Sequence, residues 1–334
     1  MSATRALRIT AAPLALAVAV SLPLAAQAEI RVVASIAPVH SLVAGVMAGI
    51  GEPVLLIPAG ISEHTTSLRP SQAESLAQAS AIFWVGPELE AFLAKPLETL
   101  AGGAKVVELF EAEGVTKLPL REGEDFEGHE GEDERADDHA DDPDGESGEA
   151  AEAEHEGEHG EEYDAHIWLD PRNAQAMLGA IVTTLATLDP DHAAQYRANG
   201  KAMSARIEDV SGEIEQQLQP VRGKGFIVFH DAYSYFENRF GLQAAGSIMV
   251  NPETMPGAAR ITEIRTKIGQ LGATCVFAEP QYNPAVAAVV IEGTDARTST
   301  LDPVGAAIPP GPDQYPQLLR QLAGSLRECL GGSS

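Results

Sequence analysis

The sequence predicts a protein of the α/β class with two lobes joined by a single long helix and a ligand site in the cleft between them. Short apolar runs alternate with stretches of helical periodicity, as they do in parallel sheets built from crossover units. An acidic segment interrupts this alternation in mid-chain, and the same alternation then returns. Between the two series, residues 190–219 carry apolar side chains at helical spacing, which predicts the linking helix.

The first lobe is predicted to span residues 29–189. Apolar runs at 30–35, 54–57, 81–85 and 106–109 are predicted as strands. Helices are expected at 38–48, 71–78 and 171–187, the last of them opening at the dipeptide Asp170-Pro171.

The second lobe, residues 220–334, repeats this pattern. Strands are expected at 225–229, 275–278 and 298–301, and helices at 233–240, 257–271, 284–293 and 315–330. Both lobes are therefore expected to be Rossmann-like. The carboxyl ends of their strands would face one another, and open sheets bind ligands at that edge.

The N-terminus has the features of a secretory signal peptide. Arg5 and Arg8 precede an apolar stretch, residues 11–26, which is followed by the small-x-small sequence Ala26-Gln27-Ala28. A membrane anchor is the alternative, but the stretch is short for a span and contains two prolines. We expect residues 1–28 to be cleaved near Ala28, leaving a mature chain without membrane insertion in the periplasm of a double-membraned bacterium.

Most of the net charge of −27 lies in one segment. Residues 122–162 contain 21 acidic side chains against a single basic one, Arg135, and so supply −20 of the total. With four histidines and almost nothing apolar, the loop 121–163 is predicted to be disordered. Two roles are open for it, a loose collector of metal ions through its histidines and carboxylates, or a solvated tether. The sequence has no cluster of basic residues that could bind the phosphates of a nucleic acid, so nucleic-acid binding is not expected.

Cys275 and Cys329 are the only cysteines of the chain. In an oxidising compartment such a pair is more often a disulfide than a metal site. A bridge between them closes a loop of about 55 residues, for which the chain-entropy model gives roughly 4 kcal/mol. We predict that it stabilises the second lobe.

Three histidines share one topological position and are the candidate metal ligands. His64 lies in a loop after a predicted strand, His166 marks the restart of ordered sequence before a helix, and His230 follows the strand 225–229 directly. All three are therefore expected at the cleft. Neutral imidazole suits zinc and copper, whereas manganese and magnesium prefer oxygen ligands.

A carboxylate is expected to complete a tetrahedral shell. Glu63 and Asp302 occupy matching loop positions, and the sequence does not choose between them. His40 and His192 are interpreted as structural residues at helix starts.

Several motifs together resemble one family. SEHTTSLRPS, FWVGPELEAF, HIWLDP, FHDAYSYF, NPETMPGAARITEIR, CVFAEPQ and TLDPVG occur in this order between about residues 30 and 330. They are similar to the ZnuA proteins, periplasmic zinc-binding components of ABC-type zinc uptake systems.

The resemblance implies one Zn²⁺ held in the cleft by His64, His166 and His230, and a fourth ligand that is water or a carboxylate. Manganese-binding relatives carry a carboxylate at the position of His230. It also implies the Cys275–Cys329 disulfide, a monomer, and delivery of zinc to the membrane subunit of an ABC zinc permease.

Two other classes of function fit parts of this pattern. A zinc-dependent hydrolase is the alternative, because three histidines with an open fourth position also describe catalytic zinc. The chain contains no HExxH motif to supply a general base, so we expect no enzyme activity. An adhesion protein is a weaker alternative, since the sequence shows no repeats.

Overall fold

The computed structural model describes residues 30–332 except 59, 65–66, 122–125, 127–162, 250–255, 273–274 and 284. The predicted signal peptide, residues 1–28, lies outside the described residues. So does the acidic segment apart from Phe126, including His129, His139, His155 and His159. The expectations for those parts of the chain stay predictions.

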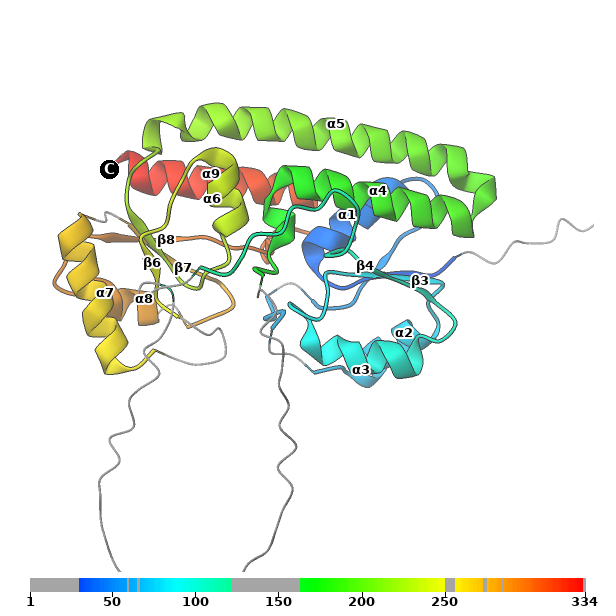
Figure 1. Ribbon diagram of the computed structural model, residues 1–334, viewed down its shortest axis with the longest axis horizontal. Helices are drawn as coiled ribbons and strands as arrows, with labels where there is room; N and C mark the ends of the chain where they lie inside the picture. The colour runs from blue at the N-terminus through cyan, green and yellow to red at the C-terminus, as the bar shows by residue number, and fades with distance from the viewer. Residues whose placement is uncertain are drawn as a thin grey trace, which may run out of the picture.

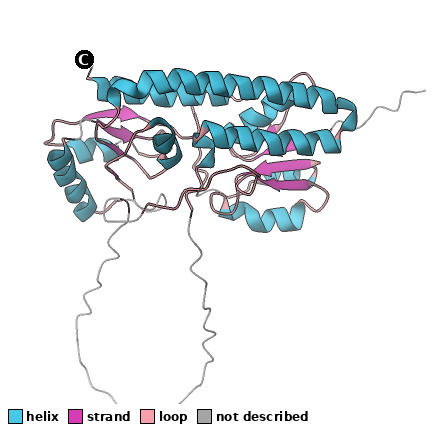
Figure 2. Ribbon diagram, turned by 45° about the horizontal axis from the view of Figure 1, so that its top comes forward, coloured by secondary structure: helices cyan, strands magenta, loops and turns pink. Residues whose placement is uncertain are grey.

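The N-terminal lobe is built on a parallel sheet (Figures 1 and 2). Its elements are β1 (Val32–Ala34), α1 (Ala37–Met47), β2 (Val54–Leu55), α2 (Pro70–Ala77), β3 (Ala81–Trp84), α3 (Ala91–Leu100) and β4 (Lys105–Glu108). The strand order is β2-β1-β3-β4, with every neighbouring pair parallel. All residues of β1 and β3 are buried, as expected for central parallel strands covered by helices on both faces.

The C-terminal lobe has the same strand order. Its elements are β5 (Phe226–Val228), α6 (Ser234–Phe240), β6 (Gly246–Ser247), α7 (Ala258–Leu271), β7 (Cys275–Ala278), α8 (Ala285–Ile291), β8 (Arg297–Thr300) and α9 (Gln314–Gly331). The strands lie in the order β6-β5-β7-β8 and are again parallel. Each lobe therefore gathers the loops that follow its strands at one edge.

Helix α3 and strand β6 were not among the elements predicted from the sequence. Helix α3 carries Pro96 in its interior, a residue that normally argues against a helix. Strand β6 consists only of Gly246 and Ser247, which have no apolar side chain to mark a strand. Its pairing with Ile227 and Val228 of β5 defines it instead.

A series of helices connects the lobes. It comprises η1 (Ile167–Leu169), α4 (Pro171–Leu188), η2 (Pro190–His192), α5 (Ala193–Leu218) and η3 (Gln219–Val221). Helix α5 has 26 residues, a length of about 39 Å, and runs along both lobes (Figure 1). Its buried residues recur every three or four positions, among them Met203, Ile207, Val210 and Ile214.

The linking helix is not the only connection between the lobes. Helix α9 lies beside α5 and also contacts α1 of the N-terminal lobe, so that every residue of α1 is buried. One continuous core contains Phe83 of the first sheet, Ile207 of α5 and Phe277 of the second sheet. Packing as well as chain connectivity therefore joins the two halves.

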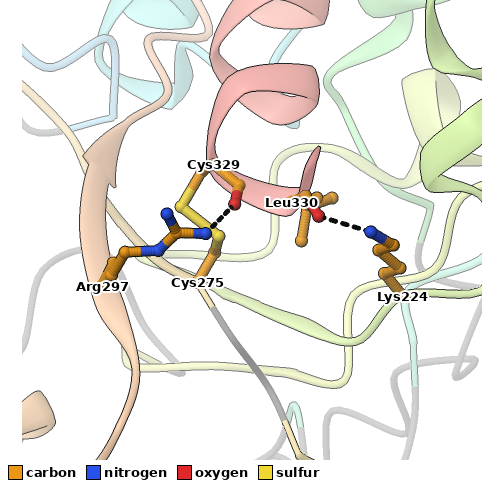
Figure 3. The surroundings of a disulfide bond; sticks show 5 residues. All are labelled: Lys224, Cys275, Arg297, Cys329 and Leu330. Atoms are coloured by element: carbon orange, nitrogen blue, oxygen red, sulfur yellow. Dashed lines mark hydrogen bonds between the residues drawn. A yellow bond between two sulfur atoms is a disulfide. The ribbon is translucent and has the colours of Figure 1, made fainter. Parts of the chain in front are cut away.

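The predicted disulfide joins Cys275 of β7 to Cys329 of α9, with Cα atoms 6.0 Å apart. Two cations lie at the same helix end (Figure 3). Arg297 donates to the carbonyl of Cys329 at 2.6 Å, and Lys224 donates to that of Leu330 at 2.7 Å. Carbonyls in the last turn have no partner within the helix, so these contacts and the helix dipole both favour the arrangement.

Among the described residues, no helix combines the length and the apolar character needed to cross a membrane.

Candidate metal centre

His64, His166 and His230 converge on one point. Each offers a ring nitrogen, and the three nitrogens all lie within 4.8 Å of one another. The ring centroids of His166 lie 5.3 Å from those of both His64 and His230, and the His64–His230 distance is 5.7 Å. Within the described parts of the chain, this is the one group of histidine, cysteine or acidic side chains that could hold a metal ion.

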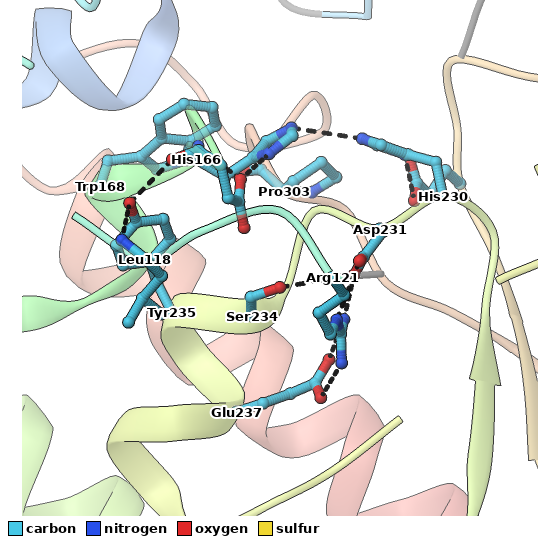
Figure 4. Close-up of polar contacts among 12 residues, drawn as sticks. Leu118, Arg121, His166, Trp168, His230, Asp231, Ser234, Tyr235, Glu237 and Pro303 are labelled. Atoms are coloured by element: carbon cyan, nitrogen blue, oxygen red, sulfur yellow. Dashed lines mark hydrogen bonds and ion pairs between the residues drawn. The ribbon is translucent and has the colours of Figure 1, made fainter. Parts of the chain in front are cut away.

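The spacing of two of these nitrogens fits a shared zinc ion. The Nε2 atoms of His166 and His230 are 3.3 Å apart (Figure 4). Two ligands of a tetrahedral zinc at about 2.0–2.1 Å are separated by about 3.3–3.4 Å. The pair therefore has the separation of two ligands of one ion.

His166 is held by the segment that opens α4. Residues 166–171 are all buried, and the 3₁₀ turn η1 fixes the chain between the ligand and the Asp170 cap of α4. The Nδ1 atom of His166 lies 2.7 Å from Oδ1 of Asp164, which also accepts the backbone N–H of His166 at 2.9 Å. Its ring is thereby anchored on the side opposite Nε2.

His230 follows β5 and is anchored in the same manner. Its Nδ1 atom lies 2.8 Å from Oε1 of Glu279, which directly follows β7 and also accepts the hydroxyl of Tyr233 at 3.1 Å. Burial lowers the pKa of His230, but the charge and hydrogen bond of Glu279 outweigh it, and the net shift is upward.

His64 differs from the other two ligands. Its backbone N–H donates to Ser62 Oγ at 3.3 Å, and its Nε2 is buried without a hydrogen-bond partner among the described residues. Burial, followed by the charges of His166 and His230, lowers the pKa of His64 to about 2. The imidazole is therefore neutral at physiological pH, as a metal ligand must be.

Neither candidate carboxylate belongs to the group of converging atoms. Asp302 uses Oδ1 to accept the N–H groups of Val304 and Gly305 at 3.1 and 2.9 Å, and Oδ2 to accept that of Ala306 at 2.6 Å. Glu63 is buried, which raises its pKa, whereas the charges of His166 and His230 act in the opposite direction.

His40 and His192 lie elsewhere. His40 is buried in α1 with its Nε2 3.0 Å from the carbonyl of Pro53, and His192 is exposed with Nδ1 2.7 Å from Asp189.

The site lies where segments of the two lobes meet. Arg121, which directly precedes the acidic segment 122–162, pairs with Asp231, the residue after His230, and with Glu237 of α6 (Figure 4). The hydroxyl of Tyr235 in α6 accepts the N–H of Leu118 and donates to the carbonyl of Asp164. These contacts fix the position of the His166 segment relative to α6.

Asp164 and Glu279 were not identified from the sequence. In the parallel register of β5 and β7, Phe226 lies opposite Cys275, and His230 and Glu279 each follow four residues later, so the rule that found His230 could have found Glu279. For Asp164 the only signal is its place two residues before His166, at the edge of the acidic segment.

The chain matches known proteins over most of its length. Residues 32–329 match the family described as ZnuA, zinc-uptake complex component A, periplasmic. The chain is 53% identical over 304 residues to the high-affinity zinc uptake system protein ZnuA of Brucella abortus (strain 2308), covering 90% of this chain and 91% of that protein. Identity to the protein of the same name from Yersinia pestis is 40% over 303 residues, with 91% and 92% covered.

A crystal structure of ZnuA superimposes with a TM-score of 0.72 at 24% identity, covering 90% of this chain and 99% of that one. At this identity the likeness supports the fold alone.

Proposed function

Because the chain belongs to the ZnuA family of periplasmic zinc-uptake components, we propose that it binds Zn²⁺ through His64, His166 and His230. The protein serves high-affinity zinc uptake, and its family is one of substrate-binding transport proteins. The comparisons give no support to the alternative of a zinc hydrolase. The observation that carries the ligand assignment is the convergence of three imidazoles, two of them with Nε2 atoms 3.3 Å apart.

The donor set suits capture of zinc from dilute solution. Imidazole nitrogens favour zinc over manganese and magnesium, which prefer oxygen. His230 belongs to the C-terminal lobe and the other two ligands belong to the first half of the chain. A shared ion therefore links the lobes directly, and separating them removes ligands from the ion.

Glu63 is the better candidate for a fourth protein ligand. Asp302 already accepts hydrogen bonds from three backbone N–H groups and from Gln281, and coordination would break some of them. Glu63 adjoins His64, and its carboxylate is coupled electrostatically to His166 and His230. A positive ion at the three imidazoles would favour its charged form.

The partner and the processing follow from the family. We propose that the loaded protein delivers its ion to the membrane subunit of an ABC zinc permease, and that cleavage near Ala28 releases the mature chain into the periplasm. The proposed units are lobes 29–189 and 220–334 with 190–219 between them.

Isothermal titration of the mature protein with zinc and with manganese tests the assignment. We expect tight zinc binding, much weaker manganese binding, and loss of the tight site in the His64→Ala/His166→Ala/His230→Ala variant. His192→Ala is the matched control, because that imidazole also pairs with a carboxylate but lies outside the site. Tight zinc binding by the triple variant would refute the assignment.

The same titration addresses the acidic segment. A variant lacking residues 122–162 is expected to keep the tight site. A fall in the number of weakly bound zinc ions would identify the segment as a collector, and an unchanged number would identify it as a tether.

A further inference from the structure

Two of the three proposed ligands share a feature that the third lacks. The Nδ1 atoms of His166 and His230 face the carboxylates of Asp164 and Glu279 at 2.7 and 2.8 Å. Both carboxylates are buried, with 2% of their surface exposed. An ionised carboxylate only accepts hydrogen bonds, so in each pair Nδ1 carries the proton.

That placement determines what the other nitrogen does. A neutral imidazole has one N–H, and either nitrogen can carry it. With the proton on Nδ1, the Nε2 atoms of both rings keep their lone pairs free, and these are the two atoms that lie 3.3 Å apart. In the other tautomer of either ring the proton lies on Nε2, and that N–H would point toward the ion and could not coordinate it.

The carboxylates are themselves held in place. The backbone N–H of Asp164 donates to Leu118 at 2.9 Å, and its carbonyl accepts the Tyr235 hydroxyl at 2.7 Å. Glu279 follows β7 and accepts the Tyr233 hydroxyl at 3.1 Å. Rotation of the Asp164 carboxylate would break its hydrogen bond from the backbone N–H of His166, and rotation of the Glu279 carboxylate would break the one from Tyr233.

Each arrangement also carries a cost. Asp164 Oδ2 is buried without a hydrogen-bond partner among the described residues, and Glu279 Oε2 has no neighbour there other than Nδ1 of His230, 2.8 Å away, which it shares with Oε1. Buried polar atoms left unpaired destabilise a fold. Two such carboxylates, each behind one imidazole of the same cluster, point to a role in the site rather than in stability.

We propose that Asp164 and Glu279 are positioning residues that fix the tautomer and ring orientation of His166 and His230. They hold the Nε2 atoms of these two histidines ready for coordination before the ion arrives. The proposal rests on the function proposed above. Carboxylates behind metal-bound imidazoles typically contribute about 10–100-fold in metal affinity, because they orient the ring and raise its basicity.

The first test is made on the zinc-free, mature wild-type protein. Long-range ¹H–¹⁵N NMR at pH 8 reports which nitrogen of each imidazole carries the proton. We expect Nδ1–H with free Nε2 for both His166 and His230. Detection of Nε2–H as the main form of either ring would overturn the proposal, whatever the variants do.

The second test uses Asp164→Asn and Glu279→Gln, whose amides can accept from or donate to Nδ1 and so permit both tautomers. We expect a tautomer mixture at His166 only in the first variant and at His230 only in the second. Zinc affinity, measured by chelator competition, should fall about 10–100-fold in each. Asp189→Asn is the matched control, since it removes the carboxylate that faces His192 and should leave zinc affinity unchanged.

The outcomes separate the two proposals. If both variants keep wild-type tautomers and affinity while the triple histidine variant loses zinc, positioning is refuted and the zinc site stands. If wild-type protein fails to bind zinc, the proposed function itself is refuted. Restored affinity in Glu279→Asp relative to Glu279→Gln would further support a role for the charge.

Discussion

The indole Nε1 of Trp168 donates a 2.8 Å hydrogen bond to the backbone carbonyl of Pro303. Trp168 lies in the turn that follows His166, and Pro303 lies in the loop that follows β8 of the other lobe. The hydroxyl of Tyr315 reaches the same turn and donates to the carbonyl of Trp168 at 2.6 Å. The segment that carries one proposed ligand is therefore bound to the C-terminal lobe through contacts of its own.

Replacing Trp168 by Phe tests this contact. The substitution leaves the buried Pro303 carbonyl without its donor, which we expect to cost about 1–3 kcal/mol in addition to the lost packing. Trp84→Phe is the control, because Trp84 is also buried but its Nε1 has no hydrogen-bond partner among the described residues. Urea denaturation of both variants measures the difference. Equal destabilisation would show that the interlobe hydrogen bond contributes nothing.

Zinc affinity should fall as the pH is lowered. Protons compete with the ion for imidazole nitrogen, and each proton displaced at binding changes the apparent affinity by about tenfold per pH unit. The upward-shifted pKa of His230 places the onset of this competition above the ordinary histidine value, whereas His64, with a pKa of about 2, stays neutral. Chelator competition at pH 8, 7, 6 and 5 measures the profile. The same affinity at pH 5 and pH 8 is incompatible with this prediction.

The free energy of unfolding should also depend on pH, because of the buried side chain of Glu90. The side chain is fully buried, and burial raises its pKa to about 7 even though Val85 and Gly86 donate to its Oε2. The folded protein then holds a proton that the unfolded chain releases. Protonation of Glu90 therefore adds about 3 kcal/mol to the free energy of unfolding. This contribution is complete below about pH 4.5 and is lost as the pH rises through about 7.

Glu90→Gln removes that proton while keeping an acceptor oxygen. Between pH 5 and pH 8 the wild type should therefore lose about 2.5 kcal/mol of unfolding free energy that the variant does not lose. Glu213→Gln, at an exposed pair with Arg320, is the control and should not alter the pH profile in this manner. Superimposable pH profiles for Glu90→Gln and the wild type would count against the prediction.

The disulfide should contribute to the free energy of unfolding but not to the arrangement of the zinc ligands. In Cys275→Ala/Cys329→Ala we expect the free energy of unfolding to drop by about 2–4 kcal/mol, because the open chain has more unfolded conformations. Denaturation with and without reductant measures this. Reductant should destabilise the wild type by a similar amount and leave the variant unchanged. An insensitive wild type would mean that the bridge contributes little.

Local sequence predicted the main elements because their signals are local. The runs that became β3, β5 and β7 are apolar and lie fully or nearly fully buried. Helix α3 and strand β6 were missed because Pro96 argues against a helix and Gly246-Ser247 has no strand propensity. There, tertiary packing and pairing with β5 override the local preference.

The histidines were predictable for a topological reason, since the loops after parallel strands meet at one edge. The carboxylates were harder, because an acidic side chain takes its role from whatever it faces. Asp302 illustrates this: its carboxylate closes a turn on the N–H of Val304, two residues on, as aspartates before Pro and Gly often do. Its assignment as a ligand stays a prediction.

Helix α9 is the last element of the chain, yet the N–H of Tyr315 at its start donates to the hydroxyl of Ser41 near the beginning. The interior of the first half is therefore incomplete until the final twenty or so residues have left the ribosome. The order in which this chain is synthesised therefore differs from the order in which its interior can be completed, because the last helix covers the first one.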